Sequence, residues 1–175
     1  MKPTINNINK LTKISNKFRS KIINKFTEIQ EGHPGSILSI LDIVTSIYTG
    51  KYLKITKNLK KNDYLIISKG HAASVQYPFL IDAGLISENE WTNWSKFSKK
   101  KSIFRIFGNT DIKGINATTG SLGHGIGIGA GIAFSLKKKG LNKKVFVIIS
   151  EGELYEGSTW ESLMFASHHK LNNLH

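Results

Sequence analysis

The stretch Val145–Gly157, which reads VFVIISEGELYEG, contains a short apolar run that stops at a cluster of acids and glycines. Five apolar residues in a row end at Ile149, and three carboxylates and two glycines follow Ser150 within seven residues. A continuous apolar run bounded by turn residues is typical of a strand buried on both faces of a parallel sheet. The stretch therefore predicts a buried strand over 145–149 with acidic residues at its carboxyl end.

The rest of the chain alternates between apolar runs and helical periodicity. A second short run, Tyr64–Ile67, predicts another buried strand, and the letters SKGHA of Ser68–Ala72 follow it directly. Apolar residues at three- and four-residue steps predict the helices. These span about 5–30, 37–48, the segment from SKGHA through Ala83, a short segment after Ser87, 122–138 and 158–169. Strands that alternate with helices predict an α/β fold, with helices on both faces of a parallel sheet and one domain over residues 1–175.

Two of the predicted helices begin with residues that can cap them. Ser36, which follows the break GHPG at Gly32–Gly35, is placed to cap the next helix. Ser87 and Glu90 have the spacing of a capping box, in which each side chain bonds the backbone of the other residue. Residues 98–120 are punctuated by glycines, and we expect them to be irregular.

The composition limits the classes of protein to which the chain can belong. The chain of 175 residues has a formal net charge of +13 and no cysteine, which excludes disulfides and thiolate metal sites. Of its 25 basic residues only Arg19 and Arg105 are arginines, and the lysines are scattered. Nucleic-acid surfaces favour clustered arginines, so a nucleic-acid-binding module is a distant alternative. No stretch approaches about 18 apolar residues, and we expect no membrane span and a cytoplasmic protein.

Residues with chemical potential follow both predicted strands. His71 comes after the first strand, and Glu151 and Gly152 come after the second. Because ligands of open α/β sheets bind beyond the carboxyl ends of the strands, we expect these residues to share a site. A carboxylate there suits a hard cation such as Mg²⁺, and a glycine lets a phosphate approach the backbone closely. The strand ends therefore predict a site for a metal and a diphosphate.

The segment Thr118–Gly125, TTGSLGHG, adds a second anion-binding feature. It combines hydroxyl side chains with three glycines at a helix start, where backbone amides and the helix dipole favour an anion. It is not a Walker loop, because no Gly-Lys-Ser/Thr follows, and no apolar strand immediately precedes it as a dinucleotide fingerprint requires. Two other interpretations stay open: the glycines that continue to Gly131 allow close helix packing, and Glu151–Glu153 form a solvated turn.

Five motifs together resemble a known family. They are GHPGS, SKGHA, TGSLGHGIGIGAGIA, SEGELYEGSTWES and HHKLNNL. In this order and spacing they resemble the N-terminal half of transketolase, from about Glu28 to Leu174. The resemblance implies the thiamine-diphosphate-binding fold, thiamine diphosphate and Mg²⁺ as cofactors, and transfer of a two-carbon ketol unit between sugar phosphates. Deoxyxylulose-phosphate synthase has a similar layout and stays the alternative enzyme.

The resemblance also implies roles for individual residues. His33 resembles a histidine that faces the donor sugar hydroxyls and could move protons near the reacting carbon. His71 resembles a histidine that contacts the cofactor diphosphate and the substrate side of the pocket. Glu156 resembles a buried acid in the subunit-interface network, linked to the carboxylate that activates the aminopyrimidine. At the cofactor, the resemblance places Gly120, Ser121, Leu122, Gly152 and Glu153.

Two site residues depart from the family pattern. Glu151 stands where the metal ligand is normally an aspartate, and its longer side chain moves the carboxylate outward by one methylene. Since Mg²⁺ demands near-ideal octahedral geometry, we expect a lower affinity for the metal. Asn109 stands where the family usually has a substrate-binding histidine. An asparagine can hydrogen-bond the substrate, but it cannot carry a proton near neutral pH.

The resemblance predicts that residues 1–175 form a domain that is incomplete at its C-terminus. In the family, the next strand supplies an asparagine side chain and a backbone carbonyl to the metal, and the activating carboxylate comes from the other half of the enzyme. We therefore expect this chain to be inactive alone and to need a transketolase C-terminal half or subunit, in a homo- or hetero-oligomer. The alternative is a degenerate, non-catalytic transketolase fragment.

Overall fold

A computed structural model of the chain describes residues 5–50, 52–94 and 102–175. The strands are β1 (Tyr64–Ile67) and β2 (Val145–Ile148). The α-helices are α1 (Ile5–Ile29), α2 (Pro34–Leu38), α3 (Leu41–Thr49), α4 (Tyr77–Asp82), α5 (Glu88–Asn93), α6 (Gly125–Lys138) and α7 (Gly157–His168). Short 3₁₀ helices are η1 (Leu59–Lys61), η2 (Gly70–Gln76) and η4 (Glu151–Tyr155). Both predicted strands are confirmed, and the long helical predictions are confirmed to within a few residues.

The sheet is parallel, as the apolar strands predicted. β1 and β2 run side by side, with Tyr64 opposite Val145 and the following residues paired in register. On the other edge of β2, Leu174 forms a parallel bridge to Val145. The Val147 N–H donates to the carbonyl of His175 at 2.9 Å. β2 therefore lies between β1 and the residues around Leu174.

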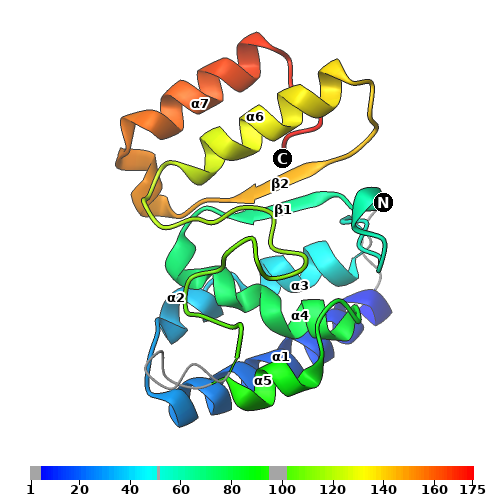
Figure 1. Ribbon diagram of the computed structural model, residues 1–175, viewed down its shortest axis with the longest axis vertical. Coiled ribbons are helices and arrows are strands. Elements are labelled where there is room, and N and C mark those ends of the chain that lie inside the picture. The colour runs from blue at the N-terminus through cyan, green and yellow to red at the C-terminus, as the bar shows by residue number, and fades with distance from the viewer. Residues whose placement is uncertain (1–4, 51, 95–101) are drawn as a thin grey trace.

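Helices cover both faces of this sheet. Successive side chains of a strand point to opposite faces. Leu65 and Ile67 pack into a large cluster with α1–α4, whereas Ile66 packs with α6 on the other face. Figure 1 shows α6 and α7 on one side of the strands and α1–α5 on the other. The α/β architecture predicted from the alternation of strands and helices is thus confirmed.

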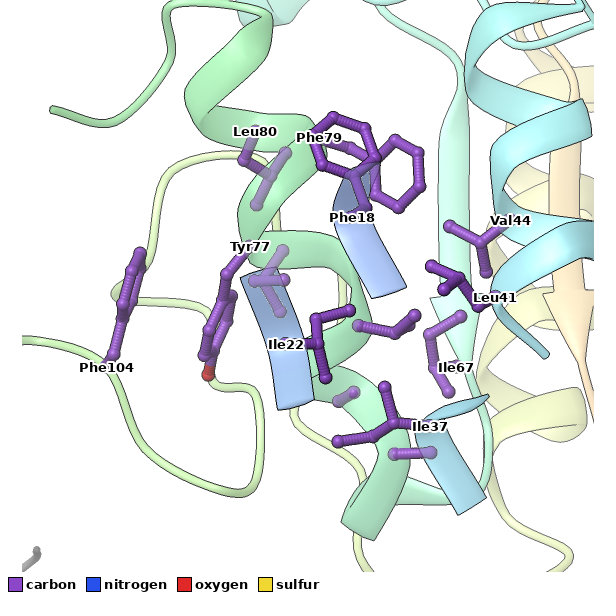
Figure 2. Packing of buried hydrophobic residues seen from close by; sticks show 14 of the residues in the cluster. Phe18, Ile22, Ile37, Leu41, Val44, Ile67, Tyr77, Phe79, Leu80 and Phe104 are labelled. Carbon is purple, nitrogen blue, oxygen red and sulfur yellow. The ribbon is translucent and has the colours of Figure 1, made fainter. Parts of the chain in front are cut away.

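The larger cluster is held by aromatic side chains from distant elements. Phe18 of α1 meets Phe79 of α4 edge to face, with ring centroids 4.5 Å apart. Tyr77 stacks on Phe104 at 4.1 Å, and its hydroxyl donates to the carbonyl of Arg105 at 2.7 Å. Figure 2 shows Phe18, Phe79 and Tyr77 near Ile22, with Phe104 on the outer side of Tyr77. Such ring pairs add about 0.5–1.5 kcal/mol each beyond the area that they bury.

The helix predicted over 37–48 is two helices, α2 and α3. Pro34 occupies the first turn of α2, and His33 is the N-cap residue without a side-chain cap bond. Ser36 lies inside α2, so the prediction that it caps the helix is wrong. Ser39 follows α2, and its hydroxyl donates to the carbonyl of Ser36 at 2.9 Å. A serine that bonds local backbone in this way competes with the helical ladder, and the helix is interrupted at this point.

The predicted capping box at α5 does not form. Ser87 is the N-cap residue, but its side chain makes no cap hydrogen bond. The Glu90 carboxylate instead accepts hydrogen bonds from the Ser102 hydroxyl at 2.8 Å and from the Ile103 N–H at 2.9 Å. Glu90 therefore joins α5 to a later segment, and this tertiary contact takes the place of the local one.

Helix α6 begins at Gly125, three residues later than predicted, after Gly123 in the left-handed region at φ +80°. A Cβ at Gly129 would overlap Val147 of β2, so α6 lies directly on the strand. A Cβ at Gly131 would meet no atom within 4 Å. Close packing therefore explains Gly129 but not Gly131.

The segment before α6 is irregular where it is described. Residues 102–120 contain turns and bends, as predicted, and residues 98–101 lie outside the described ranges. Across 5–50, 52–94 and 102–175, no helix has both the length and the apolar character needed to cross a membrane.

Candidate active site

A hollow of about 470 Å³ lies where the ends of both strands meet helix α2. β1 leads into η2, which carries His71, and β2 leads into η4, which carries Glu151 and Gly152. All three residues line the hollow, together with Gly35 and Ser36 of α2. The structure thus brings together residues that follow different strands, as expected for the carboxyl edge of a parallel sheet.

Lys69 is a lining residue that the sequence analysis missed. Its side chain is buried, with 6% exposure, and its ammonium donates to the Ser36 carbonyl at 3.0 Å and the Ser39 hydroxyl at 2.9 Å. Burial lowers the pKa of Lys69, whereas the negative charges of Glu151 and Glu153 oppose that shift. The sequence signal for Lys69 was its position. It comes after a buried strand and directly before a glycine, where the chain leaves the core at the same edge as the other site residues.

His33 and His71 lie next to each other although they belong to different motifs. Their ring centroids are 5.2 Å apart and the rings are tilted by 60°. The pKa of His71 is lowered by burial and also by the nearby His33 and Lys69, while Glu153 has the opposite effect. His71 is therefore neutral near pH 7, and one ring nitrogen can accept a proton while the other donates.

A second, larger hollow of about 560 Å³ lies on the His33 side. It is lined by His33 and Asn109, the two residues predicted to bind substrate, and by the aromatic side chains of Trp94, Phe104 and Phe107. The Asn109 side-chain oxygen accepts a hydrogen bond from the backbone of the same loop, so its amide nitrogen remains as donor. His33 lines this hollow and its neighbour His71 lines the first one.

The loop Thr118–Gly125 packs against the end of β1. The Thr119 hydroxyl donates to the Ile67 carbonyl at 2.7 Å. A Cβ at Gly70 would overlap the Thr119 carbonyl oxygen, so the two backbones touch directly. Gly120 and Ser121 are exposed beside this contact and Leu122 is half-buried. The loop predicted to lie along a cofactor therefore adjoins η2 and its His71.

Glu153 has a different position from the one that the sequence suggested. It is fully buried, with 0% exposure, and is not among the lining residues of the hollow. Its carboxylate accepts hydrogen bonds from the Gly123 N–H at 2.9 Å, from the Ser150 N–H at 2.7 Å and from the Ser68 hydroxyl. Glu153 therefore joins the ends of both strands to the glycine loop, and it supports the site from its buried side.

Glu151 is the one carboxylate that lines the first hollow. Within the described residues, no group of three or more histidines and acids could hold a metal ion. The chain thus offers a single charged oxygen ligand at this place, whereas Mg²⁺ takes six ligands and fills the rest of its shell with phosphates and waters.

Residues 11–175 match the family described as "Transketolase, thiamine diphosphate binding domain". The chain belongs to this transketolase family. One subunit of apulose-4-phosphate transketolase from Actinobacillus succinogenes is 37% identical over 145 residues, which cover 82% of this chain and 52% of that protein. Transketolase from Homo sapiens is 33% identical over 183 residues, which cover 99% of this chain and 28% of that protein.

A solved transketolase has the same fold. The crystal structure of transketolase from Campylobacter jejuni superimposes with a TM-score of 0.84 at 26% identity, over 94% of this chain and 27% of that chain. This transketolase chain therefore has the fold of the thiamine-diphosphate-binding domain. It spans about half the length of the Actinobacillus succinogenes relative and about a quarter of the other two proteins.

The hollow of this transketolase chain suits a diphosphate. Cβ atoms built on Gly35 and Gly152 meet nothing within 4 Å, so packing inside the chain does not require glycine at either position. The open space would admit phosphate oxygens close to the backbone amides. The buried ammonium of Lys69 at the same hollow favours an anionic ligand, so the residues present fit this part of thiamine diphosphate.

Exposed apolar side chains gather on η4 and α7. Glu156, which the resemblance assigns to a subunit-interface network, precedes α7 and is exposed in this chain. Tyr155 is 94% exposed, and Trp160 and Met164 are 53% and 65% exposed. We call the following residues the η4–α7 surface: Leu154, Tyr155, Trp160, Leu163, Met164 and Phe165. Contiguous apolar surfaces on soluble proteins commonly mark interaction sites.

Proposed function

We propose that this transketolase chain supplies the diphosphate-binding half of an enzyme that transfers a two-carbon ketol unit between sugar phosphates, with thiamine diphosphate and Mg²⁺. One observation carries the proposal: His71, Glu151 and Gly152, from the ends of two parallel strands, line a single hollow. The family match to a thiamine diphosphate binding domain supports it.

At the diphosphate end of the site, this chain would bind and orient. Gly152 and the loop at Gly120–Leu122 would present backbone groups to the phosphates. Glu151 would give Mg²⁺ one carboxylate oxygen. When bound, thiamine diphosphate supplies the electron sink that cleavage of a carbon–carbon bond requires. His71, neutral because burial and neighbouring charges lower its pKa, would hydrogen-bond without adding another positive charge.

In the larger hollow, this chain would hold the sugar. His33 lines the larger hollow beside His71 and would exchange protons with the sugar hydroxyls. Asn109 would donate its side-chain amide to a sugar oxygen, but it would hold no proton for transfer. Proton movement on the donor side would therefore depend on His33.

The partner that we propose is a transketolase C-terminal half or subunit, which would dock on the η4–α7 surface. The relative from Actinobacillus succinogenes is named as one subunit of its transketolase, and the full-length transketolases extend well beyond the matched region. The apolar character of the η4–α7 surface fits burial against another protein surface. Glu156, at the start of α7, would then be covered within this interface.

Gly152→Ala gives a direct test of the diphosphate site. The new methyl group meets no atom of the chain, so the fold stays intact and only a ligand in the hollow would collide with it. We expect titration calorimetry, with Mg²⁺ and the C-terminal half present, to show thiamine diphosphate binding weakened at least about tenfold, which is about 1.4 kcal/mol. Gly131→Ala on α6 is the matched control, because it also has open space around its Cβ but lies outside both the hollow and the η4–α7 surface.

The competing hypothesis is a non-catalytic transketolase fragment, and the single carboxylate at the hollow favours it. Glu151→Asp separates the two. If Glu151 binds Mg²⁺, the shorter aspartate should improve Mg²⁺-dependent binding of thiamine diphosphate, because it brings the carboxylate closer to octahedral geometry. No saturable binding by either version, with the C-terminal half supplied, would establish the non-catalytic hypothesis. Turnover of pyruvate in place of a ketose phosphate would instead identify the deoxyxylulose-phosphate synthase type.

A further inference from the structure

The charge of Lys69 is buried without a salt bridge. Only 6% of Lys69 is exposed, and its two hydrogen bonds go to a neutral carbonyl and a neutral hydroxyl. Among the described ion pairs of the chain, which involve Arg19, Lys21 and Lys25, none includes Lys69. The negative charges of Glu151 and Glu153 favour the charged form of Lys69, but neither carboxylate pairs with it directly. A buried charge that is not directly paired costs free energy, and a bound ion can offset that cost.

We infer that Lys69 is an anion-binding residue of the first hollow, with a phosphate group of the cofactor as its counter-ion. The inference rests on the proposed function, since the anion is the diphosphate of thiamine diphosphate. Among the described residues that line this hollow, Lys69 is the one lysine or arginine. The ammonium group has three N–H donors, and two of them are used by Ser36 and Ser39. The third donor remains for a phosphate oxygen.

Anion binding by Lys69 would also compensate for the weaker metal ligand. Glu151 is the one carboxylate at the hollow, and its longer side chain suits Mg²⁺ less well than an aspartate would. Lys69 balances part of the phosphate charge without any metal. Affinity for a diphosphate should therefore persist in part when Mg²⁺ is removed, and this metal-independent part should depend on Lys69.

Lys69 has a second role as a positioning residue. Its two hydrogen bonds connect the end of β1 to α2 and to Ser39 just after it. His33 is the N-cap of α2, and its ring lies 5.2 Å from that of His71. An anion that binds the same ammonium would alter this connection. It would therefore also affect the relative position of His33 and His71.

The experiment measures binding of inorganic pyrophosphate to the 175-residue chain by titration calorimetry in the absence of Mg²⁺. Lys69→Met removes the charge and keeps the length of the side chain. Lys13→Met, on exposed α1 surface, removes the same charge outside the hollow. We expect Lys69→Met to weaken binding about 10- to 100-fold, the range for a lost hydrogen bond to a charged group, and Lys13→Met to leave it within about twofold.

Stability and cofactor binding decide between the remaining explanations. If Lys69 bound only its protein partners, Lys69→Met would destabilise the chain and leave pyrophosphate binding unchanged, and this result would overturn the inference. An anion-binding lysine predicts that Lys69→Met weakens pyrophosphate binding under conditions where urea unfolding shows the variant to be fully folded, whatever the loss of its bonds to Ser36 and Ser39 does to the free energy of unfolding. Absence of pyrophosphate binding by the parent chain would also overturn the inference.

Thiamine diphosphate binding in the presence of the C-terminal half separates this inference from the proposed function. If the cofactor binds the parent and Lys69→Met equally well, the inference is wrong and the proposed function stands. If pyrophosphate binding depends on Lys69 but thiamine diphosphate does not bind, the anion site stands and the proposed function is wrong.

Discussion

The two sides of the sheet bury their apolar residues to very different degrees. On the side of α1–α4, the large cluster closes completely around residues such as Ile22 and Ile37. On the other side, α6 seals the sheet, but α7 outside it carries the exposed residues of the η4–α7 surface. Figure 1 shows α7 as the outer layer there, with no further described element above it. The first side is therefore a core that closes within the chain. The second side leaves large apolar side chains exposed, as a surface that binds another protein does.

The largest expected effect of this difference concerns stability. Ile22→Ala removes a side chain at the centre of the closed cluster (Figure 2) and should lower the free energy of unfolding by about 2–5 kcal/mol. Met164→Ala, on the η4–α7 surface, should change it by less than about 0.5 kcal/mol. Urea unfolding followed by circular dichroism measures both. Equal losses for the two variants would show that α7 packs as part of the core.

A smaller effect is expected within α6, which covers the second side of the sheet. Gly129→Ala places a methyl group against Val147 and should destabilise the chain by about 1–3 kcal/mol through overpacking. Gly131→Ala, half a turn away with open space, should stabilise it by about 1 kcal/mol because alanine favours the helix. Thermal unfolding of the two variants gives the sign of each change. A stabilising Gly129→Ala would mean that α6 does not rest on β2.

The smallest expected effect is in the pH dependence of stability. The folded state lowers the pKa of His71 from its ordinary value of 6.5, so the unfolded chain binds a proton more readily. This contribution to stability is present above pH 6.5 and is lost as the pH falls through the folded pKa. His71→Gln should therefore make unfolding less sensitive to pH below 6.5, and His168→Gln on α7 is the control. An unchanged pH profile in His71→Gln would contradict the assignment.

Much of the fold could be predicted because its patterns are local. Apolar residues at three- and four-residue steps in residues 5–30 specified α1, and the two apolar runs specified β1 and β2 with their parallel pairing. The boundary between α2 and α3 was missed because serine has competing uses near a helix end. Ser36 was predicted to cap a single helix, but its carbonyl accepts hydrogen bonds from the Ser39 hydroxyl and from Lys69 instead. Tertiary contacts of this kind have no local pattern in the sequence.

The site was predicted as a meeting of motifs, but the orientation of each acid was not. The run Glu151-Gly152-Glu153 offers two carboxylates separated by one residue. Ser150 and Glu153 form a capping box, a local spacing that the sequence analysis overlooked. This box and the contacts with Ser68 and Gly123 turn Glu153 inward, while Glu151 stays at the hollow. Lys69 was missed for a related reason, since lysines are usually exposed and its burial depends on the approach of α2.

The contact between Gly70 and Thr119 has a mechanical consequence. Backbone meets backbone there, with no side chain between them that could rotate to absorb a displacement. The Thr119 hydroxyl also fastens its loop to the last residue of β1. A ligand that displaces Gly120 would thus also displace Gly70 and the neighbouring His71. Even a methyl group at position 70 would separate the two backbones, and the two loops would then respond to a ligand separately.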